Sequence, residues 1–258
     1  MIVRETELAF IMVEQHEHAQ LSGDVARQFK NFFVDDPFFN DLVFAVYHHD
    51  LGWKRLDDTP IWNDHQAAPF SFMDYPLLPK LTHYQYGLDQ TEQMNKYAAL
   101  LCSLHYSSFG LFKGSSVEES NMFIHQEDKR QQRIKAELNL NNHEDINKPF
   151  RLLQLCDAIS LYVCLYSPGV DKEQENPWYK NGFKDSEPFN DVDDRRLVAE
   201  WISSNEIKIT PNPFDHSFHT LLKQKRVSKA LINEVGIGDA YKQSEWFNQE
   251  VVFVGRSD

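Results

Sequence analysis

The sequence predicts a mainly α-helical protein, a helical bundle with a small peripheral β element near the C-terminus. Several long segments repeat apolar residues at three- and four-residue steps, which is the period of an amphipathic helix. Strand-like patterns are found only in Glu206–Phe214 and in the closing Val251–Gly255, which we expect to pair with each other. No internal repeat or linker divides the chain, so residues 1–258 are expected to form a single domain.

The helices are placed by apolar periodicity and by the residues that interrupt it. Asp36-Pro37 ends the first helix, and Asp89-Gln90-Thr91-Glu92 has the spacing of a capping box that opens a later one. Pro149 begins the most apolar helix, which the Ser167-Pro168-Gly169 turn ends. The expected helices cover residues 14–33, 42–53, 89–107, 121–139, 149–166 and, between the two strands, 218–233.

Residues 54–80 carry four prolines and many aromatic side chains without a regular period, which predicts a long ordered loop. Long ordered loops in compact domains are usually functional. We therefore expect residues 56–79 to form a lid or pocket wall, with aromatic rings that stack on a base or another ring of a ligand.

Composition excludes several classes of protein. With 41% hydrophobic and 25% charged residues the chain is not a disordered one, and no apolar run approaches the roughly 20 residues of a membrane span. Arg4, Glu5 and Glu7 stand where a secretory signal would be apolar, and all three cysteines lie in apolar runs, as buried thiols do in a reducing compartment. We therefore expect a cytoplasmic protein. The net charge of −13 argues against a nucleic-acid polymer as partner.

Polar side chains interrupt several of the apolar helices. Asp157 lies in the most apolar one, where an uncompensated carboxylate costs several kcal/mol to bury. His105 follows two apolar residues by one turn, and the adjacent His49 and Asp50 lie above other apolar residues. Each could be an ordinary core residue, and Arg151 could pair with Asp157, but together these readings need several coincidences. One metal ion bound by neutral imidazoles and ionised carboxylates would satisfy all of them.

The order of these residues resembles the ligand order of the HD-domain superfamily of metal-dependent phosphohydrolases. The six matching positions on successive segments are His18, His49, Asp50, His83, His105 and Asp157. Gln15–Gly23, His48–Trp53 and Leu152–Tyr162 resemble the corresponding segments of a bacterial branch of this superfamily. His83 is expected just ahead of a helix and His105 at the end of that helix, an arrangement that resembles the two additional histidines of binuclear HD proteins. The resemblance covers an HD-like core of about residues 14–166 and leaves residues 167–258 as a C-terminal extension.

The resemblance implies one or two divalent transition-metal ions, with iron, manganese or zinc suiting the mixed ligands. One ion would be held by His18, His49 and Asp157 and the other by His83 and His105, with Asp50 as a catalytic bridge. A metal-activated hydroxide would then attack the phosphorus of a phosphate ester or nucleotide. If His83 does not reach the site, a single ion with His18, His49, Asp50 and Asp157 remains. The sequence leaves open whether His16 or His18 is the first ligand.

The chain departs from the family pattern at two places. Trp53 stands where a phosphate-contacting lysine often follows the glycine, so Lys54 or Arg55 would have to take that role. The segment after His105 lacks the Gly-Tyr-Pro signature of cyclic dinucleotide phosphodiesterases, so that substrate is not supported.

Three functions are therefore compatible with the sequence. The first is hydrolysis of a small phosphorylated molecule. The second is a di-iron oxygenase, which uses the same ligand set on an HD-like fold. The third is a non-catalytic HD-like module that senses a ligand. A homodimer is left open, and no membrane partner is expected.

Overall fold

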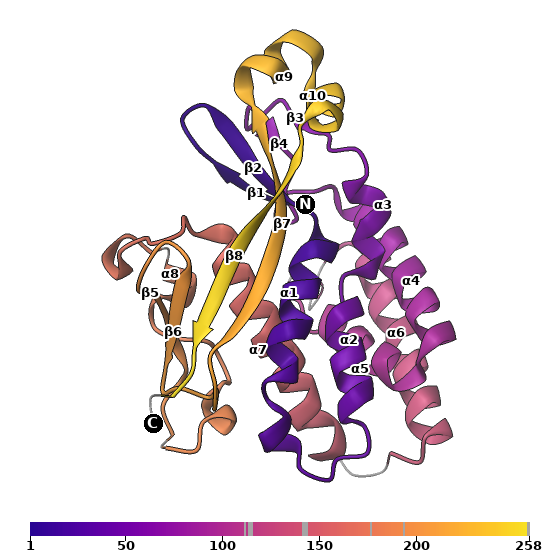
Figure 1. The fold of residues 1–258 in the computed structure, drawn as a ribbon. Helices are drawn as coiled ribbons and strands as arrows, with labels where there is room; N and C mark the ends of the chain where they lie inside the picture. Colours follow the sequence, from indigo (N-terminus) through magenta and orange to yellow (C-terminus); the bar gives the residue numbers. More distant parts are fainter. Residues whose placement is uncertain (111, 113–115, 141–143, 176, 193, 257–258) are drawn as a thin grey trace.

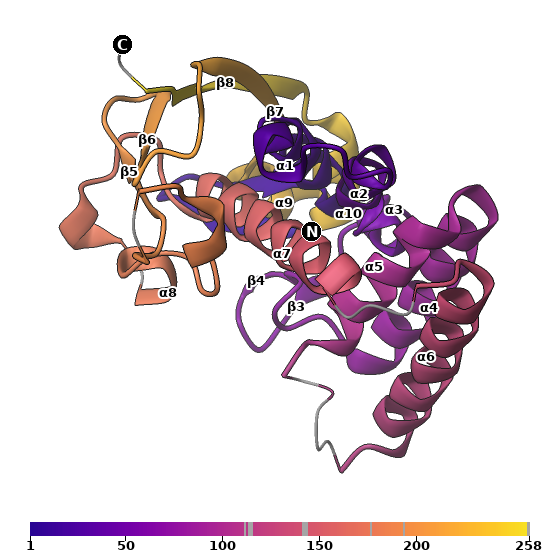
Figure 2. The same cartoon turned by 90° about the horizontal axis from the view of Figure 1, so that it is seen from below.

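The structure, a computed structural model, describes residues 1–256 apart from 111, 113–115, 141–143, 176 and 193. Long helices make up most of one side of the molecule in Figure 1. They are α1 (Gln15–Arg27), α2 (Phe39–His48), α4 (Leu77–Met94), α5 (Lys96–Ser107), α6 (Glu118–Glu137) and α7 (Glu144–Leu165). α2 packs on α1, α5 and α7, whereas α4 and α6 cover the outer side of α5 (Figure 2).

A curled six-stranded sheet forms the other side of the molecule (Figure 1). Its strands are β1 (Ile2–Glu5), β2 (Ala9–Val13), β5 (Val198–Trp201), β6 (Glu206–Thr210), β7 (Phe218–Ser228) and β8 (Trp246–Val254). The strand order is β1-β2-β7-β8-β6-β5, and every neighbouring pair is antiparallel except β6 and β8. α1 contacts β7 and α7 contacts β1, so these two helices lie between the sheet and the rest of the bundle.

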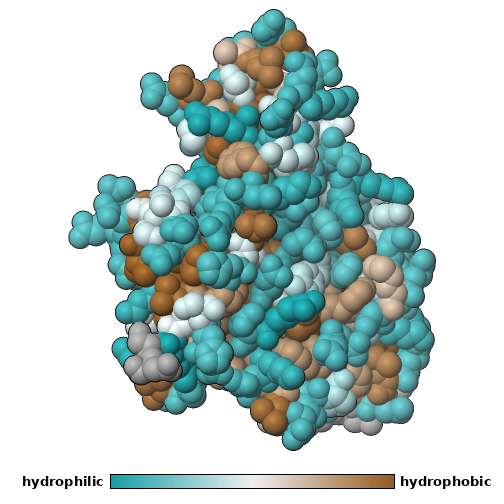
Figure 3. Space-filling model, in the orientation of Figure 1, coloured by the Kyte–Doolittle hydropathy of each residue, from teal (hydrophilic) through white to brown (hydrophobic). Residues whose placement is uncertain are grey.

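Short elements complete the chain. α9 (Lys229–Val235) and α10 (Ile237–Gln243) connect β7 to β8 and form a tip that projects from the rest of the molecule. Most of the face of the molecule that Figure 3 shows is hydrophilic. The remaining short elements are the helices η1 (Lys30–Phe33), η2 (Leu51–Trp53), α3 (Lys54–Asp57), η3 (Lys172–Gln174), α8 (Pro177–Lys180) and η4 (Glu187–Phe189), and the paired strands β3 (Trp62–Asn63) and β4 (Ala68–Pro69).

The expectation of a mainly α-helical bundle with a small C-terminal β element is wrong. The sheet draws strands from both ends of the chain, and β2 is buried along its whole length. A strand covered on both faces has a continuous apolar run rather than alternation, so Ala9–Val13 carries no period-2 signal. The helix expected over residues 218–233 is also wrong, because Phe218–Ser228 is the long strand β7 and a helix begins only at Lys229. The expected pairing near the C-terminus is confirmed, with Ile207 opposite Phe253 in a parallel ladder.

Two helix boundaries also differ from expectation. The segment Asp89–Glu92 opens no helix, because α4 continues through it to Met94. The next helix, α5, begins after Asn95, whose side chain accepts a hydrogen bond from the Ala98 backbone N–H at 2.8 Å and so caps it. His83 consequently lies inside α4 rather than ahead of a helix, while His105 does lie near the end of α5.

One hydrophobic core joins the sheet to the bundle. Phe29 of α1 packs edge-to-face against Phe189 of η4 and Phe214 after β6, with ring centroids 5.8 and 5.5 Å apart. Segments that lie almost 200 residues apart thus share one interior. Across the part of the chain that the structure describes, no helix combines the length and apolar character of a membrane span.

Candidate metal centre

Four helices bring imidazoles and carboxylates into one buried group. His18 comes from α1, His105 from α5 and Asp157 from α7, while His49 and Asp50 follow the end of α2. Successive residues on a helix diverge by about 100 degrees. α2 ends at His48, however, and Asp50 has φ −109° and ψ 24°, so both His49 and Asp50 can face the same interior. The end of α2 therefore supplies two functional groups from adjacent positions.

Glycine at position 52 lets helix α4 pack directly against this turn. A Cβ atom on Gly52 would lie 2.5 Å from the His83 carbonyl oxygen, and one on Gly87 would lie 2.5 Å from the Gly52 nitrogen. Both contacts are with backbone, which cannot move aside as a flexible side chain can. The two glycines thus fix the turn that carries His49 and Asp50 against α4.

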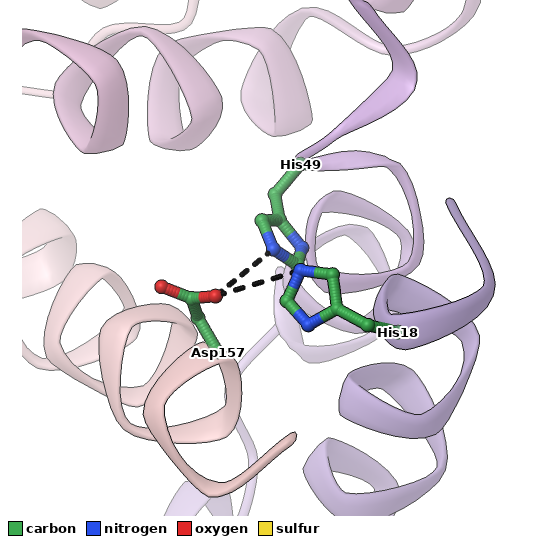
Figure 4. A group of neighbouring side chains, drawn as sticks. All are labelled: His18, His49 and Asp157. Carbon is green, nitrogen blue, oxygen red and sulfur yellow. Dashed lines mark ion pairs between the residues drawn. The ribbon is translucent and has the colours of Figure 1, made fainter. Parts of the chain in front are cut away.

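Of the four distances between ring nitrogens and carboxylate oxygens, one is a hydrogen bond and three are longer contacts within reach of a shared ion. His49 Nε2 lies 3.4 Å from Asp157 Oδ1 and 3.6 Å from Asp50 Oδ2. His18 Nε2 lies 2.9 Å from Asp50 Oδ2 and 3.6 Å from Asp157 Oδ1. Two ligands about 2.1 Å from one ion, at angles of 90–120°, are about 3.0–3.6 Å apart. Figure 4 shows the two imidazoles directed at the same Asp157 oxygen.

The hydrogen bonds on the far side of each ring determine which nitrogen faces the carboxylates. His49 Nδ1 lies 2.7 Å from the Val46 carbonyl oxygen, which can only accept, so Nδ1 carries the proton. The Ser160 hydroxyl donates to the Asp157 carbonyl and accepts from Ser22, and so accepts from His18 Nδ1 at 2.7 Å. The neutral His49 ring therefore presents its Nε2 lone pair to carboxylate oxygens, which is unfavourable unless a cation lies between them. His18 Nε2 instead lies at hydrogen-bond distance, 2.9 Å, from Asp50 Oδ2, where either a proton or a metal ion can join the two atoms.

The electrostatics of the group also favour a cation between the imidazoles and the carboxylates. Burial alone would lower the pKa of His49, but the carboxylates of Asp50 and Asp157 raise it to about 9. Burial would raise the pKa of Asp50 and of Asp157, yet the neighbouring imidazoles hold both pKa values below the usual range. The site thus favours positive charge, which a proton or a metal ion can supply. His49 Nε2 is buried without a hydrogen-bond partner among the described residues.

His105 lies beside this group on the second oxygen of Asp157. Its Nε2 atom is 3.6 Å from Asp157 Oδ2, and its ring packs edge-to-face against His49 with centroids 5.4 Å apart. Burial lowers the pKa of His105 to about 4, so this imidazole is neutral near pH 7. It is therefore available as a ligand or as a proton acceptor.

Of the six predicted ligands, the structure brings together five: His18, His49, Asp50, His105 and Asp157. Within the described residues His83 makes no hydrogen bond or ion pair with them, and its Nδ1 atom is buried without a partner. His16, the alternative first ligand, lies next to Gln20, with 3.4 Å between the two Nε2 atoms. His18 is the α1 histidine in contact with the carboxylates.

The two candidate phosphate-binding residues lie on α3, directly after the turn. Lys54 is exposed and has no ion pair among the described residues. Lys54 lies near enough to the site to act on His16, two residues before His18, because burial and the Lys54 ammonium together lower the pKa of His16 to about 4. Arg55 instead lies over the Tyr86 ring, 4.2 Å from its centroid, and donates to the Tyr86 hydroxyl at 2.9 Å. Lys54 is thus the freer of the two cations.

Three hydroxyl groups that sequence reasoning missed support the ligands. Ser160 holds His18, Ser22 donates to Ser160 at 2.7 Å, and the Tyr106 hydroxyl donates to Asp50 Oδ1 at 3.4 Å. All three are buried. Ser22 and Ser160 could have been found from the sequence, because each is a polar residue among apolar residues of its helix. Ser160 also lies one turn after Asp157.

His18, His49 and Asp157 therefore form a buried group that could bind a metal ion. Residues 1–229 match the model of a family described as Protein of unknown function (DUF3891), and the chain belongs to this family. No curated protein and no solved structure was found to match the chain.

Proposed function

We propose that the protein is a metal-dependent hydrolase of phosphate esters, built around a divalent iron, manganese or zinc ion. The observation that carries the proposal is the buried His49 Nε2 atom, which faces Asp50 and Asp157 and has no hydrogen-bond donor or acceptor of its own among the described residues. Mixed imidazole and carboxylate donors suit these metals better than calcium. His18 Nε2, His49 Nε2, Asp50 Oδ2 and Asp157 Oδ1 would hold the ion.

A bound divalent ion of this kind lowers the pKa of water and polarises phosphoryl oxygens. The protein's own groups have distinct roles in the proposal. Ser160 and the Val46 carbonyl orient the two imidazoles, and Tyr106 donates to the outer oxygen of Asp50. Neutral His105 can accept a proton next to Asp157, and Lys54 supplies positive charge for a phosphate at the border of the site.

Hydrolysis is favoured over the di-iron oxygenase by the way in which the donors are grouped. His18, His49 and Asp157 supply donor atoms within 4.8 Å of one another, Asp50 Oδ2 lies 2.9 Å from His18 Nε2, and His105 alone among the described residues extends the group through an ion-pair distance. A second ion would need further donors, and His83 makes no described contact with the group. One divalent ion suffices for Lewis-acid hydrolysis.

The test is phosphate release from a panel of phosphomonoesters, measured with purified protein supplied in turn with Mn(II), Fe(II) and Zn(II). Wild type is expected to release phosphate, and Asp50→Asn and Asp157→Asn to lose at least about a hundredfold in rate because each removes a metal ligand. Asp128→Asn, which changes an exposed carboxylate on α6, is the matched control and should keep full activity.

Three outcomes would overturn the proposal. Activity unchanged in both aspartate variants would place the chemistry elsewhere. Oxygen consumption by the iron-loaded protein without phosphate release would identify an oxygenase. Metal-loaded protein that is inert toward the whole panel would indicate a non-catalytic, ligand-sensing role.

A further inference from the structure

A pocket of about 440 Å³ is lined by residues of α7 and of α8 and the segments that follow it. Figure 2 shows where these two helices lie. α7 contributes Gln154 and Ala158 to its lining, and α8 contributes Trp178 and Tyr179. Lys184 and Arg196 add two cationic groups, and Asp185 adds one carboxylate. The pocket thus combines flat aromatic rings, an amide and an excess of one positive charge on a protein whose net charge is −13.

The lining of the pocket borders the candidate metal centre. Gln154 precedes Asp157 by three residues and Ala158 follows it, so the α7 side of the pocket lies within about one helical turn, roughly 5–6 Å, of the Asp157 side chain. The Gln154 amide donates to Ser108 Oγ at 3.2 Å, and Ser108 donates to the His105 carbonyl at 2.6 Å. The Asp157 side chain, at 18% exposure, is the most exposed of the five grouped residues.

The chemistry of the lining suits an aromatic ring joined to an anion. The Trp178 residue is 54% exposed, which leaves part of its indole accessible to a ligand. Arg196 Nε pairs with Glu187 at 3.1 Å and Lys184 Nζ with Asp185 at 3.8 Å, but these ion pairs are solvent-exposed and hence weak. An anionic ligand can compete for such cations, while a planar ring stacks on the indole.

We propose that the α7–α8 pocket binds the planar aromatic ring of an anionic ligand, and that the ester hydrolysed at the metal centre carries such a ring. The second half rests on the proposed function, whereas ring binding stands on the pocket itself. Trp178 and Tyr179 hold the ring, and Arg196 and Lys184 attract the anionic group. Trp178, Tyr179, Lys184 and Arg196 lie outside the segment that resembles the HD-domain superfamily, residues 14–166.

The test is calorimetric binding of phenyl phosphate and of adenosine 5′-monophosphate, compared with ring-free glycerol 3-phosphate and inorganic phosphate. The two ring-bearing probes are expected to bind more tightly, and Trp178→Ala to weaken them by about fivefold or more, because stacking on an aromatic side chain is lost. Glycerol 3-phosphate binding should not change. Trp178→Phe keeps an aromatic face and should restore most of the affinity.

Trp246→Ala is the matched control, since it removes another partly exposed indole, on β8. Equal affinity for ring-bearing and ring-free probes, or no effect of Trp178→Ala, would overturn the pocket assignment. Circular dichroism of each variant excludes misfolding as the cause of any loss.

Steady-state kinetics separate this inference from the proposed function. If the metal centre hydrolyses phenyl phosphate, Trp178→Ala should raise KM for that ester and leave KM for glycerol 3-phosphate unchanged. Ring binding that depends on Trp178, without any hydrolysis, would support the pocket assignment and contradict the proposed reaction. Hydrolysis together with unchanged KM values and unchanged binding in Trp178→Ala would support the proposed reaction and contradict the pocket assignment.

Discussion

Replacing Ser160 by alanine removes a single hydroxyl that holds a predicted metal ligand in place. Ser160 Oγ lies 2.7 Å from His18 Nδ1 and is fully buried, so no water can take its place without rearrangement. The buried Nδ1–H group would lose its acceptor, which costs about 1–3 kcal/mol of the free energy of unfolding. Loss of such an outer hydrogen bond typically weakens metal binding by about 10–100-fold.

A chelator-competition titration with Zn(II) measures that affinity, and urea unfolding of the metal-free protein measures the stability. Ser103→Ala is the matched control, because Ser103 is equally buried and accepts a hydrogen bond from the Gln131 amide at 3.0 Å, away from the imidazoles. Both variants should lose stability, but only Ser160→Ala should lose metal affinity. Equal Zn(II) affinities in the two variants would refute the role assigned to Ser160.

Three further predictions concern the ligands and their surroundings. Metal affinity should rise about tenfold per pH unit from pH 6 to 8, because the pKa of metal-free His49 is raised to about 9 and the ion must displace the proton on His49. A metal affinity that does not change with pH would exclude His49 as a ligand. Gly87→Ala should lower the free energy of unfolding by about 1–3 kcal/mol, because its Cβ would lie 2.5 Å from the Gly52 nitrogen. The control Gly238→Ala, whose Cβ would have Thr59 Cγ2 at 3.6 Å as its nearest neighbour, should keep the wild-type stability, and equal urea midpoints for the two variants would contradict this. Lys54→Gln should raise KM for glycerol 3-phosphate about fivefold and leave metal content unchanged, and an unaltered KM would remove Lys54 from the phosphate site.

The grouped residues were predictable from sequence because burying a charge is a local problem with few solutions. Asp157 and His105 lie in apolar stretches of their helices, so their burial could be expected from periodicity alone. The adjacent His49 and Asp50 were a further indication of a buried polar group. Their roles as ligands stay predictions, as does the resemblance to the HD-domain superfamily.

The position of His83 was misjudged because local helix signals compete with tertiary contacts. Asp89 and Glu92 have the spacing of a capping box, but Glu92 pairs with Arg133 at 2.7 Å and the neighbouring Thr91 hydroxyl donates back to the Gly87 carbonyl at 2.9 Å. Both interactions fit a continuing helix, and Asn95 caps the next one instead.

The sheet was largely unpredictable because distant pairing decides it. Phe218–Ser228 is compatible with a helix by composition, yet it pairs with β2 on one side and β8 on the other. Each partner lies far away in the sequence or beyond two intervening helices, so no local window contains the information. Likewise, the hydroxyl of Tyr106 meets Asp50 only because α5 packs against the end of α2.

Metal analysis of the purified protein tests the central claim most directly, with wild type, Asp50→Asn and Asp157→Asn compared after equal exposure to Fe(II), Mn(II) and Zn(II). Wild type should retain about one equivalent, because the donor atoms of His18, His49 and Asp157 form a single group, and both variants should lose it while their circular dichroism stays that of the wild type. Full wild-type metal content in both variants, or a wild-type protein that retains none of the three metals, would contradict the account.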